Sequence, residues 1–351
     1  MGFLINPYNF AAAGSGGWVE LGRTTLGSAS DNINVSSLTD KRYYMVLGDF
    51  KASGGIAADL RLNTDTGNNY AYRVSDNGGA DVTDTNTSVI HGQLGVSTPE
   101  FIVGYLSNKS DKEKLYIGHL VNQNTAGAGT APQRVEITGK HAQTTNPITS
   151  VDYVDRQAGQ FASGSEVVVL GWNPADTHTN NFWTELASVD VSGGLIDTNV
   201  FTAKKYLWIQ GYCINGTVSG GFQGMFVGNG TVDKTTPSYS LRYSVNGSVS
   251  DGTAINQSVN GPFALTGQGG ASSNDISFFN IFVINNASKE KLFIGHNTFG
   301  SKTGGAGVAN NRTECVAKWT NTSNQINRIS LEYVGGGGSL TAGTLKVWGS
   351  D

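Results

Sequence analysis

Residues 112–119 read KEKLYIGH and residues 289–296 read KEKLFIGH, so one eight-residue stretch occurs twice with a single substitution. Further similar pairs follow in the same order along both halves: 18–21 with 183–186, 41–44 with 204–207, 69–75 with 238–244, 127–129 with 305–307, and 134–136 with 312–314. The separation drifts from 163 residues (41 to 204) to 178 residues (134 to 312), which indicates small insertions between collinear halves. A repeat this long exceeds the roughly 20–50 residues of a solenoid unit and has the size of a domain. The sequence therefore predicts two copies of one domain.

The composition and the spacing of apolar residues favour an all-β fold. Gly accounts for 48 of the 351 residues, and charged residues make up only 14%. Short apolar runs lie between Gly, Asn and Asp turn signals; examples are YYMVL at 43–47, EVVVL at 166–170 and SFFNIFVI at 277–284. Apolar spacing that would sustain a helix over three turns is scarce. We expect two tandem antiparallel jelly-roll or β-sandwich domains related by the internal repeat.

Turn-rich and polar segments suggest where these domains begin and end. The glycine-rich stretch GSGG at 14–17 closes an N-terminal arm, residues 1–17. The polar stretch 174–181 reads as a connector. These boundaries leave a first domain over residues 18–173 and a second over residues 182–351. In both domains a Gly turn followed by an apolar run forms the expected last strand.

Charge and hydropathy exclude several classes of protein. The net charge is −4, whereas a nucleic-acid-binding protein needs a clustered basic surface. Runs of about 18 apolar residues, the length that spans a membrane as a helix, do not occur. Residues 1–13 lack a basic start, and Asn6 and Pro7 interrupt their apolar run, so we expect no signal peptide. We therefore predict neither a nucleic-acid nor a membrane partner.

The chain holds two cysteines, Cys213 and Cys315, both in the second half. They could form a disulfide or remain as two buried free thiols. The second alternative is favoured, because a large sandwich does not need a covalent staple.

Residues 63–69 read NTDTGNN and resemble an oxygen-rich calcium loop. Calcium loops bring several carboxylate or carbonyl oxygens around a sharp turn, and here Asp65 is the only acid. An Asn- and Gly-rich hairpin turn accounts for the same residues. We predict a turn, with Asp65 as a weak metal candidate, and no cofactor.

Catalytic motifs are absent from the sequence. His119 and His296 occupy equivalent positions of the repeat, but neither lies at metal-ligand spacing from other histidines or acids. Nucleophile elbows, phosphate-binding loops and dinucleotide fingerprints do not occur. We expect each histidine ring to be hydrogen-bonded or solvated at a strand end, and we expect a protein without enzymatic activity.

Three aromatic residues alternate with polar neighbours in a way that is typical of exposed rings: Tyr72, Tyr243 and Trp319. Sugar-binding sandwich domains stack glycans on such rings. A carbohydrate- or receptor-binding β-sandwich that contacts a host-surface glycan is therefore an alternative function.

Three short segments resemble structural proteins of phage particles. GFLINPYNF at 2–10 resembles the start of many tailed-phage structural proteins, LNTDTGNNY at 62–70 resembles a hairpin of jelly-roll virion domains, and FASGS at 161–165 resembles the segment before their last strand. The resemblance covers most of the first domain and extends more weakly to the second, where residues 229–239 depart from the hairpin pattern. It implies a virion component, located in the virion after synthesis in the host cytoplasm, that assembles with itself and with other virion proteins.

Two tandem jelly rolls in a chain of this length also resemble double jelly-roll major capsid proteins, which form trimers with a pseudo-sixfold outline. The halves of those proteins are usually dissimilar, whereas these two halves are alike. The resemblance therefore favours a capsid decoration, spike or tail-associated protein that forms a homo-oligomer, with a trimer favoured. A major capsid protein is the alternative.

The N-terminal arm is too apolar for a solvated tail, and we expect it to pack on another subunit. Its large apolar side chains are Phe3, Leu4, Ile5, Tyr8 and Phe10. Each contributes about 1.5–3 kcal/mol when buried. Deletion of residues 2–14 should therefore leave a protein that folds but assembles poorly, as judged by light scattering. Unchanged assembly of the deletion variant would contradict this role.

Overall fold

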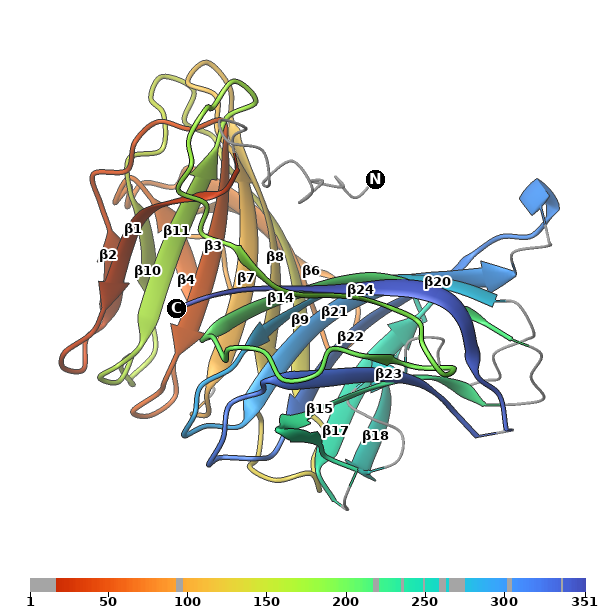
Figure 1. Ribbon diagram of the computed structural model, residues 1–351. Coiled ribbons are helices and arrows are strands. Elements are labelled where there is room, and N and C mark those ends of the chain that lie inside the picture. The colour runs from red at the N-terminus through yellow and green to blue at the C-terminus, as the bar shows by residue number, and fades with distance from the viewer. Residues whose placement is uncertain are drawn as a thin grey trace. The chain divides into compact units, whose positions relative to one another are not determined.

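A computed structural model describes residues 17–92, 97–216, 221–234, 237–248, 250–258, 263–264, 275–301, 305–335 and 337–351 (Figure 1). Within these ranges the regular structure consists of β-strands and one short 3₁₀ helix, so the expected all-β class is confirmed. Residues 1–16 lie outside the described ranges, and with them the expected assembly contacts Phe3, Leu4, Ile5, Tyr8 and Phe10.

The described residues of the first half form eleven strands, coloured red to yellow-green in Figure 1: β1 (Val19–Thr25), β2 (Asn32–Val35), β3 (Tyr43–Phe50), β4 (Asp59–Leu62), β5 (Tyr70–Asp76), β6 (Val82–Thr87), β7 (Glu100–Ser107), β8 (Lys114–Asn122), β9 (Gln133–His141), β10 (Val151–Val154) and β11 (Glu166–Trp172).

The second half forms the strands coloured green to blue: β12 (Thr184–Asp190), β13 (Ile196–Asp197), β14 (Tyr206–Asn215), β15 (Phe222–Asn229), β16 (Thr231–Val232), β17 (Tyr239–Val245), β18 (Gly252–Gln257), β19 (Phe263–Ala264), β20 (Asp275–Ile284), β21 (Lys291–Ser301), β22 (Asn311–Trp319), β23 (Arg328–Val334) and β24 (Leu340–Ser350). The 3₁₀ helix, Gly305–Gly307, lies between β21 and β22.

Two compact units divide the chain. Among the described residues, unit 1 comprises 17–76, 81–120 and 135–183, apart from the undescribed residues 93–96. Unit 2 comprises the described residues from 184 onward together with two short segments of the first half, 77–80 and 121–134. The compact units therefore do not coincide with contiguous halves of the sequence.

Each half contributes one eight-stranded antiparallel sheet and one smaller sheet. The large sheets have the orders β1-β11-β3-β7-β8-β9-β5-β6 and β12-β24-β14-β20-β21-β22-β17-β18. The small sheets have the orders β2-β10-β4 and β13-β23-β15-β16, and β19 also pairs with β15. When the two-residue strands β16 and β19 are set aside, the two halves have the same strand order in both sheets.

The core of unit 1 lies between its two sheets, as in a β-sandwich. Val46 and Val167 from the large sheet and Ile33 and Tyr153 from the small sheet are fully buried in one cluster. The rings of Phe50 and Tyr153 meet with centroids 4.9 Å apart. The period-2 alternation of the strands directs these side chains inward, and their burial supplies the main stabilising term.

Unit 2 repeats this arrangement with different side chains. Ile209 and Val347 from the large sheet are buried in one cluster with Met225 and Leu331 from the small sheet. Cys213 and Cys315 are buried free thiols, which is the favoured of the two alternatives. Burial raises the pKa of the Cys213 thiol to about 12, so this cysteine is a packing residue rather than a nucleophile.

Two buried lysines occupy the same position at the start of β8 and β21. The Lys114 ammonium donates hydrogen bonds of 2.8–2.9 Å to three backbone carbonyl oxygens, those of Lys109, Lys112 and Gln143. The Lys291 ammonium donates to three carbonyl oxygens at 2.7–3.3 Å, those of Ala287, Lys289 and Asn321. Burial lowers the pKa of Lys291 to about 8. Each ammonium thus fastens the turn before its strand to a loop about 30 residues further along the chain.

Replacing Lys291 by Met should destabilise the protein, because it removes the shared donor of three backbone carbonyl groups. We expect a loss of about 2 kcal/mol, since hydrogen bonds to a charged group contribute about 1.5–3 kcal/mol each and these bonds are partly exposed. Thermal unfolding measures this loss, and Lys289→Met at an exposed position of the same turn is the matched control. Equal melting temperatures of the two variants would contradict the structural role of Lys291.

Candidate functional site

The loop that contains Asp65 is a turn organised by the aspartate itself. Asn63 and Thr64 adopt left-handed conformations, with φ of 55° and 52°. The Asp65 carboxylate accepts hydrogen bonds from Gly67 N, Asn69 Nδ2 and His141 Nε2, each at 2.8 Å. Partial burial works to raise the pKa of Asp65, but these hydrogen bonds outweigh it and lower the pKa. Both Asp65 carboxylate oxygens are therefore engaged in holding the turn.

A matching arrangement in unit 2 shows that Trp319 is not exposed. The indole Nε1 of Trp319 donates to Asp233 Oδ2 at 3.0 Å, as His141 does to Asp65. Tyr239 donates its hydroxyl to Asp233 O, as Tyr70 does to Asp65 O. Trp319 is 1% exposed, so the expectation of an exposed glycan-stacking ring at this position was wrong.

The error has a simple structural origin. Trp319 follows Lys318 at the end of β22, and the polar neighbour suggested that the ring faces solvent. Trp319 occupies the inward position of the strand, and the centroid of its ring lies 5.5 Å from the Lys291 ammonium nitrogen. Lys318 occupies the outward position and is itself covered.

The two other candidate glycan contacts are half-buried. Tyr72 packs against the core of unit 1, with its ring centroid 5.6 Å from that of His91. Tyr243 lies over Gly252, where any side chain would collide with the ring. One side of each ring is therefore already occupied by the protein.

A buried charge cluster in unit 1 was not predicted from the sequence. The fully buried Asp59 carboxylate bonds to His91 Nδ1 at 2.7 Å, to Gly92 N at 2.9 Å and to Arg156 Nε at 2.5 Å. Burial works to raise the pKa of Asp59, but the bonds and charges of His91 and Arg156 lower it. Residues 59, 91 and 156 are far apart in the sequence, so no local motif could have identified the cluster.

The Asp59 cluster resembles half of a hydrolytic relay, in which a carboxylate orients a histidine. The other ring nitrogen of that histidine must then bond a nucleophile. Within the part of the chain that the structure describes, the His91 ring makes its hydrogen bond to Asp59 alone. The cluster therefore fastens the loop at His91 and Gly92 to strand β4.

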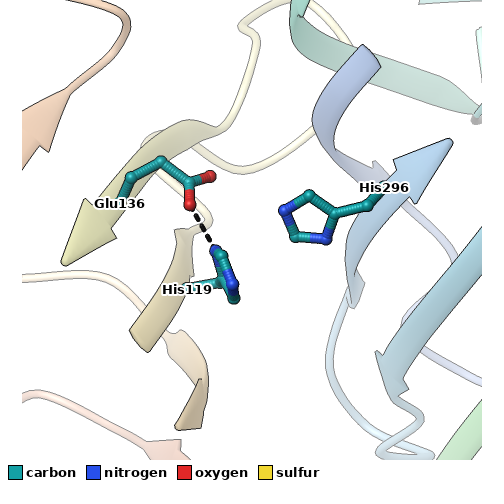
Figure 2. Close-up of side chains that lie close together, drawn as sticks. All are labelled: His119, Glu136 and His296. Carbon is teal, nitrogen blue, oxygen red and sulfur yellow. Dashed lines mark hydrogen bonds and ion pairs between the residues drawn. The ribbon is translucent and has the colours of Figure 1, made fainter. Parts of the chain in front are cut away.

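His119 and Glu136 face each other on the outer side of β8 and β9. Figure 2 shows the hydrogen bond from His119 Nδ1 to Glu136 Oε2, together with His296, the residue of β21 that corresponds to His119 in the repeat. On unit 2, His296 pairs in register with Glu314 across β21 and β22. His119 lies within β8 rather than at a strand end, and its ring is hydrogen-bonded to Glu136.

Within unit 2, the segment 121–134 is seated on the large sheet through polar contacts with β17, β18, β22 and the turn before β21. Lys318, fully buried, donates to Gln123 O at 3.2 Å and also to Thr125 O. Glu290, 3.7 Å from the Lys318 ammonium, accepts a hydrogen bond from Gly127 N at 2.6 Å. Burial lowers the pKa of Lys318, and the charge of Glu290 opposes this shift.

Strands β17 and β18 hold the rest of this segment. Asn256 N donates to Ala128 O at 2.8 Å, Ser240 Oγ donates to Thr130 O at 3.0 Å, and Arg242 Nε donates to Pro132 O at 2.8 Å. The backbone of the segment is thus paired over most of its length. The backbone of one segment is thus bound by side-chain and backbone groups of the large sheet.

A buried Arg–Asp pair closes the end of the segment. The Arg134 guanidinium donates in bidentate fashion to Asp251, at 3.1 Å from Nε and 2.8 Å from Nη2, and both side chains are buried. Arg134 Nη1 also donates to Glu314 at 3.3 Å, and Arg134 N donates to Asn77 Oδ1 at 2.9 Å. A bidentate Arg–carboxylate pair adds geometric specificity as well as energy.

The comparisons with known proteins do not identify the chain. Neither a protein-family model nor a curated protein matches it. Among solved structures, the outer membrane enzyme PagL is 6% identical (72% of this chain, 97% of that chain, TM-score 0.16). Neisserial surface protein A is 7% identical (84% and 98%, TM-score 0.14), and the outer membrane protein opdK from Pseudomonas aeruginosa is 7% identical (87% and 97%, TM-score 0.14). TM-scores this low carry no argument about fold or function. Among the described residues, no helix is long and apolar enough to cross a membrane.

Replacing Asp65 by Ala should lower stability by about 2 kcal/mol, since hydrogen bonds to a charged group contribute about 1.5–3 kcal/mol each and this carboxylate is partly exposed. Thermal or urea unfolding measures the loss, with Asp111→Ala at an exposed turn of the same unit as the control.

The same measurement in the presence of calcium tests the turn interpretation. We expect calcium to leave the melting temperature of the wild-type protein unchanged, because ligand binding to the native state would raise it. A calcium-dependent shift of several degrees that is lost in Asp65→Asn would contradict this interpretation.

Proposed function

We propose that the protein is a non-enzymatic structural component of a virion, built from two copies of a jelly-roll domain, that acts by assembling with copies of itself. Capsid decoration, spike and tail-associated proteins are the components that fit best. The observation that carries the proposal is the identical strand order of the two halves. A duplicated all-β unit provides two similar sets of surfaces in one chain, which suits a repetitive shell or fibre.

Local irregularities of the sheets support the duplication. β1 is bulged between Glu20 and Gly22 in its pairing with β11, and β12 is bulged between Glu185 and Ala187 in its pairing with β24. Left-handed Asn-Gly turns follow both β5 and β17, at 77–78 and 246–247. Bulges and turns of this kind are maintained within families of related domains.

The roles of the charged residues support a structural rather than a chemical function. Lys114 and Lys291 bind backbone carbonyl groups, Asp65 holds its own turn, and Asp59 fastens a loop. In each case the group that could act in chemistry is engaged in holding the fold together.

The two alternative functions are a double jelly-roll major capsid protein and a glycan-binding module. A double jelly-roll major capsid protein would have the same tandem architecture, and the likeness of the two halves still favours a decorating or tail-associated component. A glycan-binding module loses its best candidate contact, because Trp319 is buried and Tyr72 and Tyr243 are covered on one side. We therefore prefer assembly over sugar recognition.

The purified protein should form a homo-oligomer, with a trimer expected, because permanent assemblies bury roughly 2,000 Å² or more and survive dilution. Size-exclusion chromatography with light scattering gives the mass directly. A monomer at the highest soluble concentration would contradict the proposal. Specific micromolar binding on a glycan array that is lost in Tyr72→Ala or Tyr243→Ala would instead favour sugar recognition.

A further inference from the structure

The sheet face that receives the segment 121–134 in unit 2 has a counterpart in unit 1. Lys318 and Glu290, which hold the segment, correspond in the repeat to Lys140 and Glu113. Lys140 and Glu113 also pair with each other, at 3.1 Å, but both are exposed. The same two charges are therefore covered in one unit and open in the other.

The apolar residues beside these charges follow the same pattern. Leu292 and Ile294 of β21 are 2% and 3% exposed. Their counterparts on β8, Leu115 and Ile117, are 56% and 51% exposed. Two large apolar side chains in solvent on one strand mark an interaction surface when charged residues surround them. We call this surface of unit 1 the open face; it comprises Glu113, Leu115, Ile117 and Lys140 together with Arg73 and Asp81.

The edge of the large sheet extends the open face. In unit 2 the edge strand β18 donates Asn256 N to the seated segment, and Asn256 is left-handed, with φ of 53°. In unit 1 the edge strand β6 has its corresponding Asn86 at φ 56°, and β6 is exposed over nearly its whole length. An exposed edge strand presents unpaired backbone groups to a further chain.

The seated segment also has a counterpart. Gly127 and Arg134 correspond to Gly305 and Arg312, in the connection between β21 and β22. The described residues from Gly305 to Asn310 are exposed, and so is Arg312. Arg312 N donates to Asn246 Oδ1 at 3.0 Å, as Arg134 N donates to Asn77 Oδ1. The backbone thus presents Arg312 as it presents Arg134, which is buried on Asp251.

We propose that residues 305–312 of one copy bind the open face of a second copy, in the way that the segment 121–134 is seated in unit 2. This inference rests on the proposed self-assembly and specifies its interface. Arg312 of one copy lies against Asp81 of the next, the counterpart of Asp251. The charges are complementary, because the Arg312 guanidinium meets the exposed carboxylate of Asp81, which within its own unit pairs with Arg73 at 2.9 Å. Leu115 and Ile117 are buried by the approaching segment.

The symmetry of such an interface has a direct consequence. A contact between two different surfaces of one chain is heterologous, and it generates a closed ring or an open filament. In a ring of three chains, the same contact would occur three times, once between each pair of neighbouring copies. The edge strand β6 would also be covered in every copy, which removes an aggregation-prone surface.

Charge reversal tests the interface without disturbing the cores. Arg312→Asp and Asp81→Arg each place like charges in contact between copies, so each should raise the dissociation constant of self-association at least about a hundredfold. The double variant restores opposite charges at every contact and should regain most of the wild-type association. Lys234→Asp, a charge reversal at an exposed position just after β16 in unit 2, is the control and should associate like the wild type.

Sedimentation equilibrium measures the mass, and circular dichroism verifies that each variant is folded. If the wild type associates and both single variants associate equally well, the interface is wrong while the proposed function stands. Weak association of the single variants without recovery in the double variant would also overturn the pairing of Arg312 with Asp81. A wild-type protein that stays monomeric would overturn the proposed function together with this inference.

Discussion

Three buried lysine ammonium groups, those of Lys114, Lys291 and Lys318, hold turns and loops of this structure in place through hydrogen bonds to backbone carbonyl oxygens. A charged group can leave water only when its donors are fully engaged. Lys114 and Lys291 meet that condition with oxygens from their own unit, and each thereby ties a turn to a distant loop. Lys318 meets it only because the segment 121–134 brings the carbonyl groups of Gln123 and Thr125 onto it. Lys318 therefore binds the segment 121–134 in the same way that Lys114 and Lys291 bind their loops, by donating hydrogen bonds to backbone carbonyl oxygens.

The two units agree in strand order more than in side chains. Asp65 and Asp233 both accept a ring N–H from the end of the neighbouring strand, which comes from His141 in one unit and from Trp319 in the other. Either ring can serve, because the fold requires only a planar donor on the inward side of the strand. By contrast, Lys140 and Lys318 keep the same side chain while their surroundings differ. Identity of residue at matched positions therefore does not imply identity of environment.

The sequence predicted the all-β class, because turn residues punctuate short apolar runs throughout, and it also predicted the turn around Asp65. It could not predict the Asp59 cluster, since burial of that carboxylate depends on residues brought together only by the fold. It also misassigned Trp319, because alternation along a strand tells which residues share a face but not which face is covered. A lysine such as Lys318 is ordinarily taken as an exposed residue, yet both Lys318 and Trp319 are buried, so both faces of the strand are covered at this point.

The central claim is that matched surfaces in the two halves join copies of the chain. It is tested by measuring amide hydrogen exchange in dilute and in concentrated protein. We predict slower amide exchange in the edge strand 82–87 and in residues 305–312 at the concentration where the mass rises. Amides in the core strands, such as those of 166–172, should exchange at the same rate in both samples. If the mass rises but amide exchange slows in neither of the two surface segments, these segments do not join copies of the chain.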